Sequence, residues 1–218
     1  MYYILSSNRA PKGETNDLKI TKYDLAFACP ICGTGAKLSE SLMVKGLPSK
    51  NIDFFETLDG DYLVSKILIQ KGINEGLVFN NLSIVKDTKG QELPYYSLTP
   101  EITFPQFNEN SKGLITEDQC YNCHRDGYFH DAHIGNLTEG EETAFTPLDL
   151  HYSFTNKQVL EKSDIFSSWE CLGVSNLKEE GNRIIHFARP MLIVSTNVRS
   201  FFESNKIKNA VFNKITIE

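Results

Sequence analysis

Three features of the sequence predict an α+β fold. Short apolar runs typical of strands are interspersed with helix-like segments, without the strict strand–helix alternation of a parallel α/β protein. A turn-rich stretch fills the middle of the chain, and two distant Cys-x-x-Cys pairs occur, one before that stretch and one inside it. We therefore expect a single domain over residues 1–218, with a mixed or antiparallel sheet, a few helices and a ribbon-like element around the cysteines.

The elements before residue 90 follow from periodicity and punctuation. Residues 2–5 predict an opening strand, and residues 20–28 predict a strand that leads into the first cysteine pair. Apolar residues recur at four-residue spacing over residues 59–70, which predicts a helix capped by an aspartate at its start and followed by Gly72. Residues 77–85 alternate as a strand does, and a Lys-Gly turn follows them.

Residues 91–146 predict an irregular region, because prolines and glycines recur throughout it. Irregular chain of this length is unusual inside a compact domain unless something staples it. The second cysteine pair lies in its middle, so the cysteines are the natural staple for this loop-rich insertion.

The C-terminal third predicts a compact series of elements. A Thr-x-x-Gln capping box at 155–158 favours a short helix through about residue 162. Residues 184–187 and 190–194 predict strands, Ser195 or Thr196 can cap a helix, and residues 210–217 predict a final strand. The sequence at 78–84 (VFNNLSI) is echoed at 211–217 (VFNKITI), although seven residues are too few to establish a duplication.

Charge is unevenly distributed. The chain has 22 basic and 28 acidic residues, a net charge of −6. The segment from Glu109 to Glu142 alone holds eight acidic and two basic residues, so it accounts for the whole net charge. This balance argues against a dedicated nucleic-acid binder. The segment is either a solvated face or a docking surface for a basic protein, with Glu139, Glu141 and Glu142 as candidate partner-binding residues.

Neither a membrane span nor an export signal is expected. The longest apolar runs, such as residues 191–194, fall far short of the roughly 20 residues that a spanning helix needs. The N-terminal stretch has no basic region and only four consecutive apolar residues, unlike a signal peptide. We therefore expect a cytoplasmic protein, in which a disulfide framework is unfavourable.

The two cysteine pairs predict one structural zinc site. Cys29 and Cys32 form the first pair, and Cys120 and Cys123 form the second. Each pair can place two thiolates on one side of a metal, and the two together complete a tetrahedral shell. Such a Zn²⁺ site has no open position for water, so the metal would stabilise the fold and not catalyse a reaction. The fifth cysteine, Cys171, is expected to be a buried apolar residue.

Other interpretations of the cysteines stay open. The second pair and His124 match the C-x-x-C-H pattern of c-type haem attachment, which leaves the first pair unexplained. A thioredoxin-like redox pair would need a strand–helix context that neither pair has. The cysteines could also be free thiols, and His124 could replace one of them as a ligand. His130, Asp131 and His133 could bind a metal only if they lay on a helix, and the flanking glycines favour a loop instead.

No motif in the sequence calls for an enzyme. The nucleophile-elbow, phosphate-loop, dinucleotide-binding and zinc-protease patterns are all absent from the sequence. A third hypothesis is an enzyme with a metal or a reactive thiol at an open site. Its metal would bind a water molecule, and four thiolate ligands would leave no position for that water.

With these motifs, the chain resembles the double-CxxCG motif proteins, a bacterial family related to immunity proteins encoded beside polymorphic or contact-dependent toxins. The resemblance rests on Cys29-Pro-Ile-Cys-Gly33, on Cys120-Tyr-Asn-Cys123 and on the ending from Arg189 to Ile215. One departure is that His124 stands where the family pattern has glycine. The resemblance implies a small non-catalytic protein that neutralises a cognate toxin by binding it, and the acidic segment would suit a basic toxin such as a nuclease.

The alternative function is a zinc-ribbon module that binds nucleic acid or associates with transcription. Cysteine knuckles of this type occur there, and Tyr121, Tyr128 and Phe129 could stack on bases. The acidic flank argues against it because phosphates would be repelled. The sequence leaves the identity of the toxin, the binding surface and the oligomeric state open.

Overall fold

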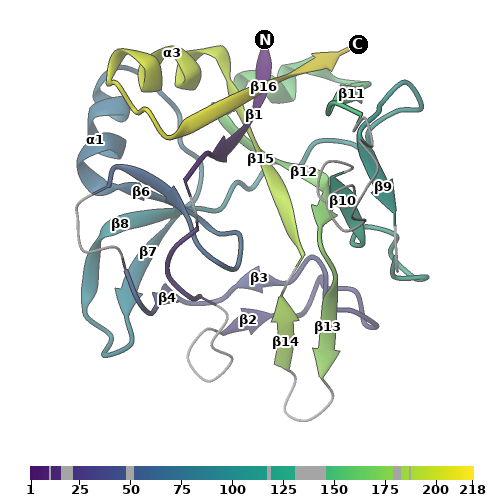
Figure 1. Cartoon of the computed structure of the whole chain (residues 1–218), viewed down its shortest axis with the longest axis horizontal. Helices are drawn as coiled ribbons and strands as arrows, with labels where there is room; N and C mark the ends of the chain where they lie inside the picture. The colour runs from purple at the N-terminus through teal and green to yellow at the C-terminus, as the bar shows by residue number, and fades with distance from the viewer. Residues whose placement is uncertain are drawn as a thin grey trace, which may run out of the picture.

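The computed structural model describes residues 1–9, 11–15, 22–47, 52–116, 119–130, 146–178, 183–186 and 188–218. Within these residues the chain is mostly β-sheet with two α-helices, in agreement with the predicted α+β class. Two five-stranded mixed sheets form the bulk of the described fold, and three two-stranded sheets lie beside them (Figure 1).

The elements divide among these sheets as follows. The first five-stranded sheet and its helix comprise β4 (Leu42–Val44), β5 (Phe54–Glu56), β6 (Tyr62–Ser65), α1 (Lys66–Asn74), β7 (Leu82–Asp87) and β8 (Glu92–Leu98). The second comprises β1 (Tyr2–Ser7), β11 (His151–Tyr152), β12 (Ile165–Leu172), β15 (Arg189–Ser195), α3 (Thr196–Ser204) and β16 (Ala210–Ile217). The small sheets pair β2 (Tyr23–Asp24) with β3 (Lys37–Leu38), β9 (Leu114–Thr116) with β10 (Tyr128–His130), and β13 (Ser175–Lys178) with β14 (Arg183–His186); a 3-10 helix, η2 (Lys157–Glu161), precedes β12.

The two five-stranded sheets have the same topology. Their strand orders are β4-β7-β8-β6-β5 and β11-β16-β1-β15-β12. In each, the first strand of that order runs parallel to its neighbour and the remaining pairs are antiparallel. A nine-residue helix connects the fourth strand of the order to the second in both. We call the first sheet with α1 the first half, and the second sheet with α3 the second half.

The halves also share the hydrogen bonds that start their helices. Ser65 caps α1, and its hydroxyl donates to Asp53 Oδ1 at 2.7 Å while its N–H donates to the Asp53 carbonyl at 2.8 Å. Ser195 caps α3 and makes the same two bonds to Asp164. A serine at the end of one strand and an aspartate just before the neighbouring strand therefore fix where both helices begin.

The strand pairing defines which residues correspond. Val64 lies opposite Tyr96 in the first half, and Val194 lies opposite Tyr3 in the second, so residues of β6, α1 and β7 correspond to residues 130 positions later. The sequence echo between residues 78–84 and 211–217 has a spacing of 133 and is out of this register by three. The two halves share an architecture, but the similar stretches at 78–84 and 211–217 do not occupy corresponding positions in it.

The halves differ in chain connectivity, because the central strand of the second half is β1. The first half takes its central strand, β8, from the chain that follows β7. The second half takes it from the start of the chain, and β1 lies between β15 and β16. The two termini consequently lie near each other in Figure 1. The second half is thus a circularly rearranged copy of the first.

Three apolar clusters hold the fold together. The largest lies between the two halves and includes Phe54 and Val64 from the first, Leu192 and Val194 from the second, and Phe202 from α3. The other two clusters cover the remaining faces of the second and first sheets. Since both sheets and both helices contribute to the central cluster, burial there joins the halves into one body.

The helix predicted over residues 59–70 is partly wrong. Leu63 and Val64 are fully buried in β6, and the helix begins only at Lys66, with Ser65 as its cap. The four-residue spacing runs across a strand–helix junction, so Ile67 is 82% exposed instead of buried. Gly72 lies inside the helix, where Phe79 and Leu77 pack against it and leave no room for a side chain.

Other elements agree more closely with the sequence. The final strand is confirmed over Ala210–Ile217, and Ser195 is confirmed as the cap of α3. The helix expected near residue 157 is the 3-10 helix η2, capped by Asn156. The region 91–146 is less irregular than predicted, since its described part contains β8, β9 and β10. Among the described residues, no helix has the length and apolar character to cross a membrane.

Candidate metal centre

Each cysteine pair lies at the tip of a two-stranded sheet. Cys29 and Cys32 occupy the turn between β2 and β3, and Cys120 and Cys123 occupy the loop between β9 and β10. We call residues 29–33 the first knuckle and residues 120–124 the second knuckle. The first knuckle precedes β4, and the second knuckle precedes β11, which occupies the matching place in the second half.

The knuckles have matching backbone bonds. The N–H of Gly33 donates to the Cys29 carbonyl at 2.8 Å, and the N–H of His124 donates to the Cys120 carbonyl at 3.0 Å. Both residues have a left-handed backbone, with φ of 82° at Gly33 and 54° at His124. The second knuckle therefore adopts the turn that glycine would favour, with histidine in its place.

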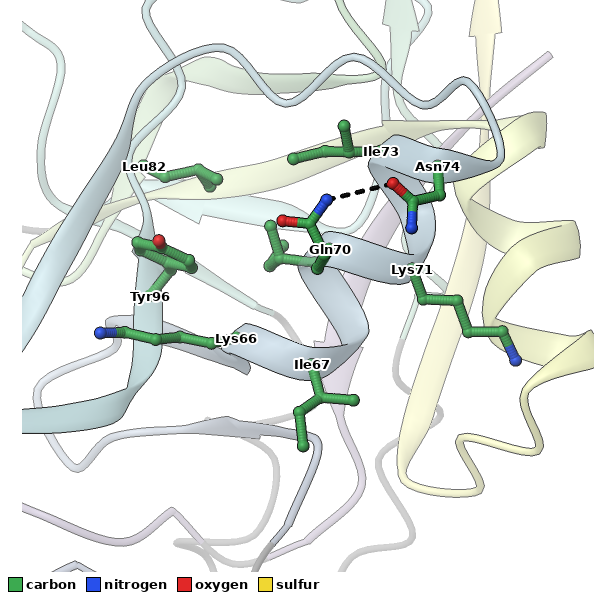
Figure 2. A pocket seen from close by; sticks show the side chains of 9 residues that line it. Lys66, Ile67, Gln70, Lys71, Ile73, Asn74, Leu82 and Tyr96 are labelled. Atoms are coloured by element: carbon green, nitrogen blue, oxygen red, sulfur yellow. Dashed lines mark hydrogen bonds between the residues drawn. The ribbon is translucent and has the colours of Figure 1, made fainter.

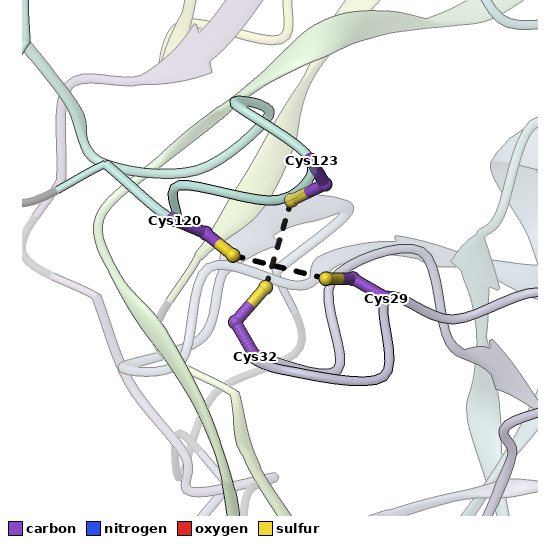
Figure 3. Close-up of side chains that lie close together, drawn as sticks. All are labelled: Cys29, Cys32, Cys120 and Cys123. Carbon is purple, nitrogen blue, oxygen red and sulfur yellow. Dashed lines mark hydrogen bonds between the residues drawn. The ribbon is translucent and has the colours of Figure 1, made fainter.

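The four sulfur atoms converge on one point (Figure 3). Cys29 Sγ lies 3.7 Å from Cys120 Sγ, and Cys32 Sγ lies 3.6 Å from Cys123 Sγ. All four sulfur atoms lie within 4.8 Å of one another. A tetrahedral ion with metal–sulfur bonds of about 2.3 Å requires sulfur–sulfur separations of about 3.8 Å. These two separations thus match the edges of a tetrathiolate metal site.

The charge on the cluster also favours a cation. Burial acts to raise the pKa of Cys29, but the N–H groups of Cys32 and Ile31 and the amide of Asn122 donate to its sulfur and bring the pKa down to about 6. Burial raises the pKa of Cys32 and of Cys123. One thiolate forms readily, and further thiolates crowded beside it need a positive charge to compensate them.

Side chains around the sulfur atoms supply additional hydrogen bonds. Asn122 Nδ2, from the second knuckle, donates to Cys29 Sγ of the first knuckle at 3.3 Å. The N–H of Thr34 donates to Cys32 Sγ at 3.5 Å, and the Thr34 hydroxyl lies 3.2 Å from the same sulfur. Such donors stabilise thiolate charge and orient the ligands of a metal site.

Asp126 and Arg125 attach the second knuckle to β13 and β12. The Asp126 carboxylate is fully buried, and it accepts bonds from the N–H of Cys120 at 3.0 Å and from the N–H of Ser175 at 3.2 Å. Arg125 Nε donates to the Trp169 carbonyl at 3.1 Å, and the N–H of Cys171 donates to the Arg125 carbonyl at 2.7 Å. The knuckle is therefore fixed to β12 and β13, and a bound metal would fix the first knuckle to the same place.

The four predicted ligands are brought together by the structure. Among the described residues, Cys29, Cys32, Cys120 and Cys123 form the one group of three or more donors close enough to hold a metal. His124 is exposed and is not part of that group. Cys171 is buried away from the cluster, and burial raises its pKa to about 12, as expected for an inert core thiol.

Several other predicted residues are placed differently or fall outside the description. Glu139, Glu141 and Glu142 lie outside the described residues, as do Asp131 and His133. Asp126, counted in the acidic segment, is fully buried and so does not contribute to an acidic surface. Of the aromatic residues expected to stack on bases, Tyr121 is 75% exposed, but Tyr128 is only 4% exposed and packs in the core.

The sequence analysis did not identify Asn122 or Asp126 as parts of the site. Asn122 lies between two cysteines in the sequence, and nothing there indicates that its amide donates to a cysteine of the other knuckle. Asp126 follows Cys123 by three residues, whereas Gly35 stands at the matching place of the first knuckle, so the two knuckles offer no shared pattern there. Both roles depend on contacts between distant segments.

Comparison of the chain with protein-family models and with curated protein sequences finds no match. The resemblance of the cysteine motifs to immunity proteins therefore stays a prediction.

Proposed function

We propose that this protein is a non-catalytic immunity protein that binds and neutralises a cognate bacterial toxin in the cytoplasm, and that a structural Zn²⁺ on Cys29, Cys32, Cys120 and Cys123 stabilises its fold. The observation that carries the proposal is the convergence of these four sulfur atoms from two hairpins that are far apart in the sequence. A clip of this kind suits a protein that presents a rigid surface to a partner.

Zinc is the metal that the donor set favours. Four thiolates at tetrahedral spacing fill the coordination shell and leave no position for water or substrate. Iron is the other metal that four cysteines commonly hold. The metal would thus contribute to folding and would join the hairpins, whatever partner the surface binds.

The proposed partner is a basic toxin such as a nuclease. This part of the proposal is supported by the charge of the segment from Glu109 to Glu142, which equals that of the whole chain. Reversing Glu139, Glu141 and Glu142 to lysine should weaken binding of the toxin and flatten its salt dependence, because acidic surfaces steer basic partners. Unchanged affinity at low salt would contradict this docking surface.

The metal is tested by elemental analysis of the purified protein, with thermal unfolding in the presence and absence of a strong chelator. We expect about one zinc per chain and a large loss of stability on its removal. A protein without metal, or with haem iron, would contradict the structural zinc site.

Toxin neutralisation is tested by co-expressing the chain with toxins encoded beside its gene and measuring growth. Rescue of growth and co-purification with one toxin are expected, and absence of rescue by the folded, metal-loaded protein would contradict the proposal. A gel shift with a mixed nucleic-acid pool at low salt tests the zinc-ribbon alternative. Robust binding would favour that alternative, which is weakened by the burial of Tyr128.

A further inference from the structure

The two halves provide an internal comparison for every exposed position. Because Ser65 and Ser195 cap helices of equal length, Ile67 corresponds to Asn197 and Ile73 corresponds to Glu203. The strand register adds one more pair.

Ile84 of β7 lies opposite Tyr96 in the first half, and Lys214 of β16 lies opposite Tyr3 in the second. Ile84 therefore corresponds to Lys214. All three pairs of positions are exposed in both halves.

Three exposed isoleucines of the first half thus stand where the second half has an amide and two charges. Ile67 is 82% exposed, Ile73 is 46% exposed and Ile84 is 37% exposed. In the second half, polar side chains occupy the same positions of the same fold. Since packing does not require isoleucine there, and since exposed apolar residues beside a groove are typical of interaction sites, these residues point to a binding surface.

Two of these isoleucines, Ile67 and Ile73, line a groove between α1 and the sheet, and Ile84 lies opposite Tyr96 of that lining. The groove has a volume of about 560 Å³, and its lining includes Ile73, Leu82 and Tyr96. Figure 2 shows Gln70 lying between Tyr96 and Ile73, with its amide bonded to Asn74 at 3.1 Å. The groove thus offers an apolar floor and two side-chain amides that can bond to a polypeptide backbone.

The charge along the groove is positive. Lys66 and Lys71 line it, and no acidic residue does. Lys66 Nζ pairs with Glu92 at 3.2 Å, but that carboxylate is 57% exposed, and such pairs exchange readily with other partners. Lys71 bonds to the neutral side chain of Asn205.

The equivalent region of the second half carries an ion pair beside its aromatic ring. Arg199 lies over the ring of Tyr3 at 4.7 Å and pairs with Glu203 at 2.8 Å. An arginine on α3 thereby covers the aromatic ring of the central strand. In the first half, Ile69 stands at the position of Arg199 and is buried, and Lys66 lies over the equivalent ring of Tyr96 at 5.4 Å instead.

We propose that the groove beside α1, with Ile67 and Ile73 in its lining and Ile84 opposite Tyr96, binds a segment of a partner protein that carries aliphatic side chains and carboxylates. Aliphatic side chains complement the apolar floor, and carboxylates complement Lys66 and Lys71. The inference rests on the proposed function only in that the chain acts by binding another protein. It names residues outside the acidic segment.

A random-peptide display library selected on the full-length, metal-loaded protein tests this surface. The matched control is a triple variant, Ile67→Asn, Ile73→Glu and Ile84→Lys, which places on the first half the residues that the second half already tolerates. Because these positions are exposed, the variant should fold with an unchanged circular dichroism spectrum and metal content. A second variant, Lys71→Glu, reverses one charge of the groove and also removes the bond to Asn205, so its circular dichroism spectrum and metal content are checked in the same way.

We expect the selected peptides to combine leucine, isoleucine or valine with aspartate or glutamate. A synthetic consensus peptide should bind the wild type at least 10-fold more tightly than the triple variant, and Lys71→Glu should weaken its binding and reduce the salt dependence. Failure to enrich peptides, enrichment of basic peptides, or equal binding to the triple variant would overturn the inference. So would a concentration-dependent dimer that the triple variant abolishes, because the occupant would then be a second copy of the chain.

These outcomes separate the inference from the proposed function. If peptides bind at the groove but no toxin is neutralised, the proposed function fails and the inference stands. If a toxin is neutralised and the triple variant binds peptides as the wild type does, the inference fails and the proposed function stands.

Discussion

The two halves of the molecule share strand order, helix length and the serine–aspartate pair that starts each helix, yet they differ at the surface and in burial. Asp53 is exposed in the first half, whereas its counterpart Asp164 is 7% exposed and bonds to more groups. The positions that the halves share define the scaffold. The positions at which they differ show where the chain is free to acquire other roles.

The largest expected effect concerns the cysteines. Cys32 in the first knuckle and Cys123 in the second occupy equivalent positions. Cys32→Ser and Cys123→Ser should each abolish stoichiometric metal binding and lower the melting temperature by at least about 10 °C. Structural zinc contributes several kcal/mol, and each kcal/mol shifts the melting temperature by about 2–4 °C in a chain of this size. Metal analysis and thermal unfolding check this.

The matched control for those variants is Cys171→Ala, which removes a buried thiol outside the cluster. It should keep one metal per chain and lower stability less than either ligand variant. Full metal binding by Cys123→Ser would show that the two knuckles are not equivalent.

A smaller effect should separate the two helix-starting aspartates. Asp164 accepts bonds from the Ser195 hydroxyl, from the N–H of Val78 at 2.8 Å and from the Asn197 amide at 3.2 Å. Asp164→Ala leaves these donors without their acceptor and should lower the free energy of unfolding by about 3 kcal/mol. Asp53→Ala should lower it by only about 1 kcal/mol, since Asp53 is exposed.

Urea unfolding of both aspartate variants measures the difference. Equal losses of stability would mean that burial does not distinguish the two caps, and the asymmetry between the halves would then be confined to their surfaces.

The smallest effect concerns the knuckle turns. Gly33→Ala should destabilise the protein by about 1–2 kcal/mol, because its φ of 82° is unfavourable for a residue with a side chain. His124→Gly should change the free energy of unfolding by less than about 1 kcal/mol, with relief of backbone strain offset by a more flexible unfolded chain. Its metal content should not change. Loss of metal in His124→Gly would instead assign the imidazole to the site.

The sequence predicted those features that depend on local or strongly patterned signals. The four cysteines, the Ser195 cap and the strand over Ala210–Ile217 all rest on short motifs or clear periodicity, and the structure contains them. The start of α1 was wrong because Leu63 and Ile67 keep helical spacing across the end of β6. Nothing in that local pattern reveals that Leu63 pairs with Ser97 of β8.

The duplication could not be predicted for a related reason. Corresponding positions such as Ile84 and Lys214 carry different residues, and the similar stretches at 78–84 and 211–217 are out of register. The shared topology resides in strand pairing between distant segments. Asp126 is a similar case, since its bond to Ser175 spans 49 residues.

The place of β1 affects the order in which the chain can fold. The first half has all its strands once residue 98 has been synthesised. The second half must wait for both ends of the chain, since Ile4 pairs with Ile193 on one side and with Asn213 on the other. During synthesis β1 emerges before the strands that it pairs with, and closing so long a loop is slow. Of the strands in its sheet, β1 therefore spends the longest time without its native partners.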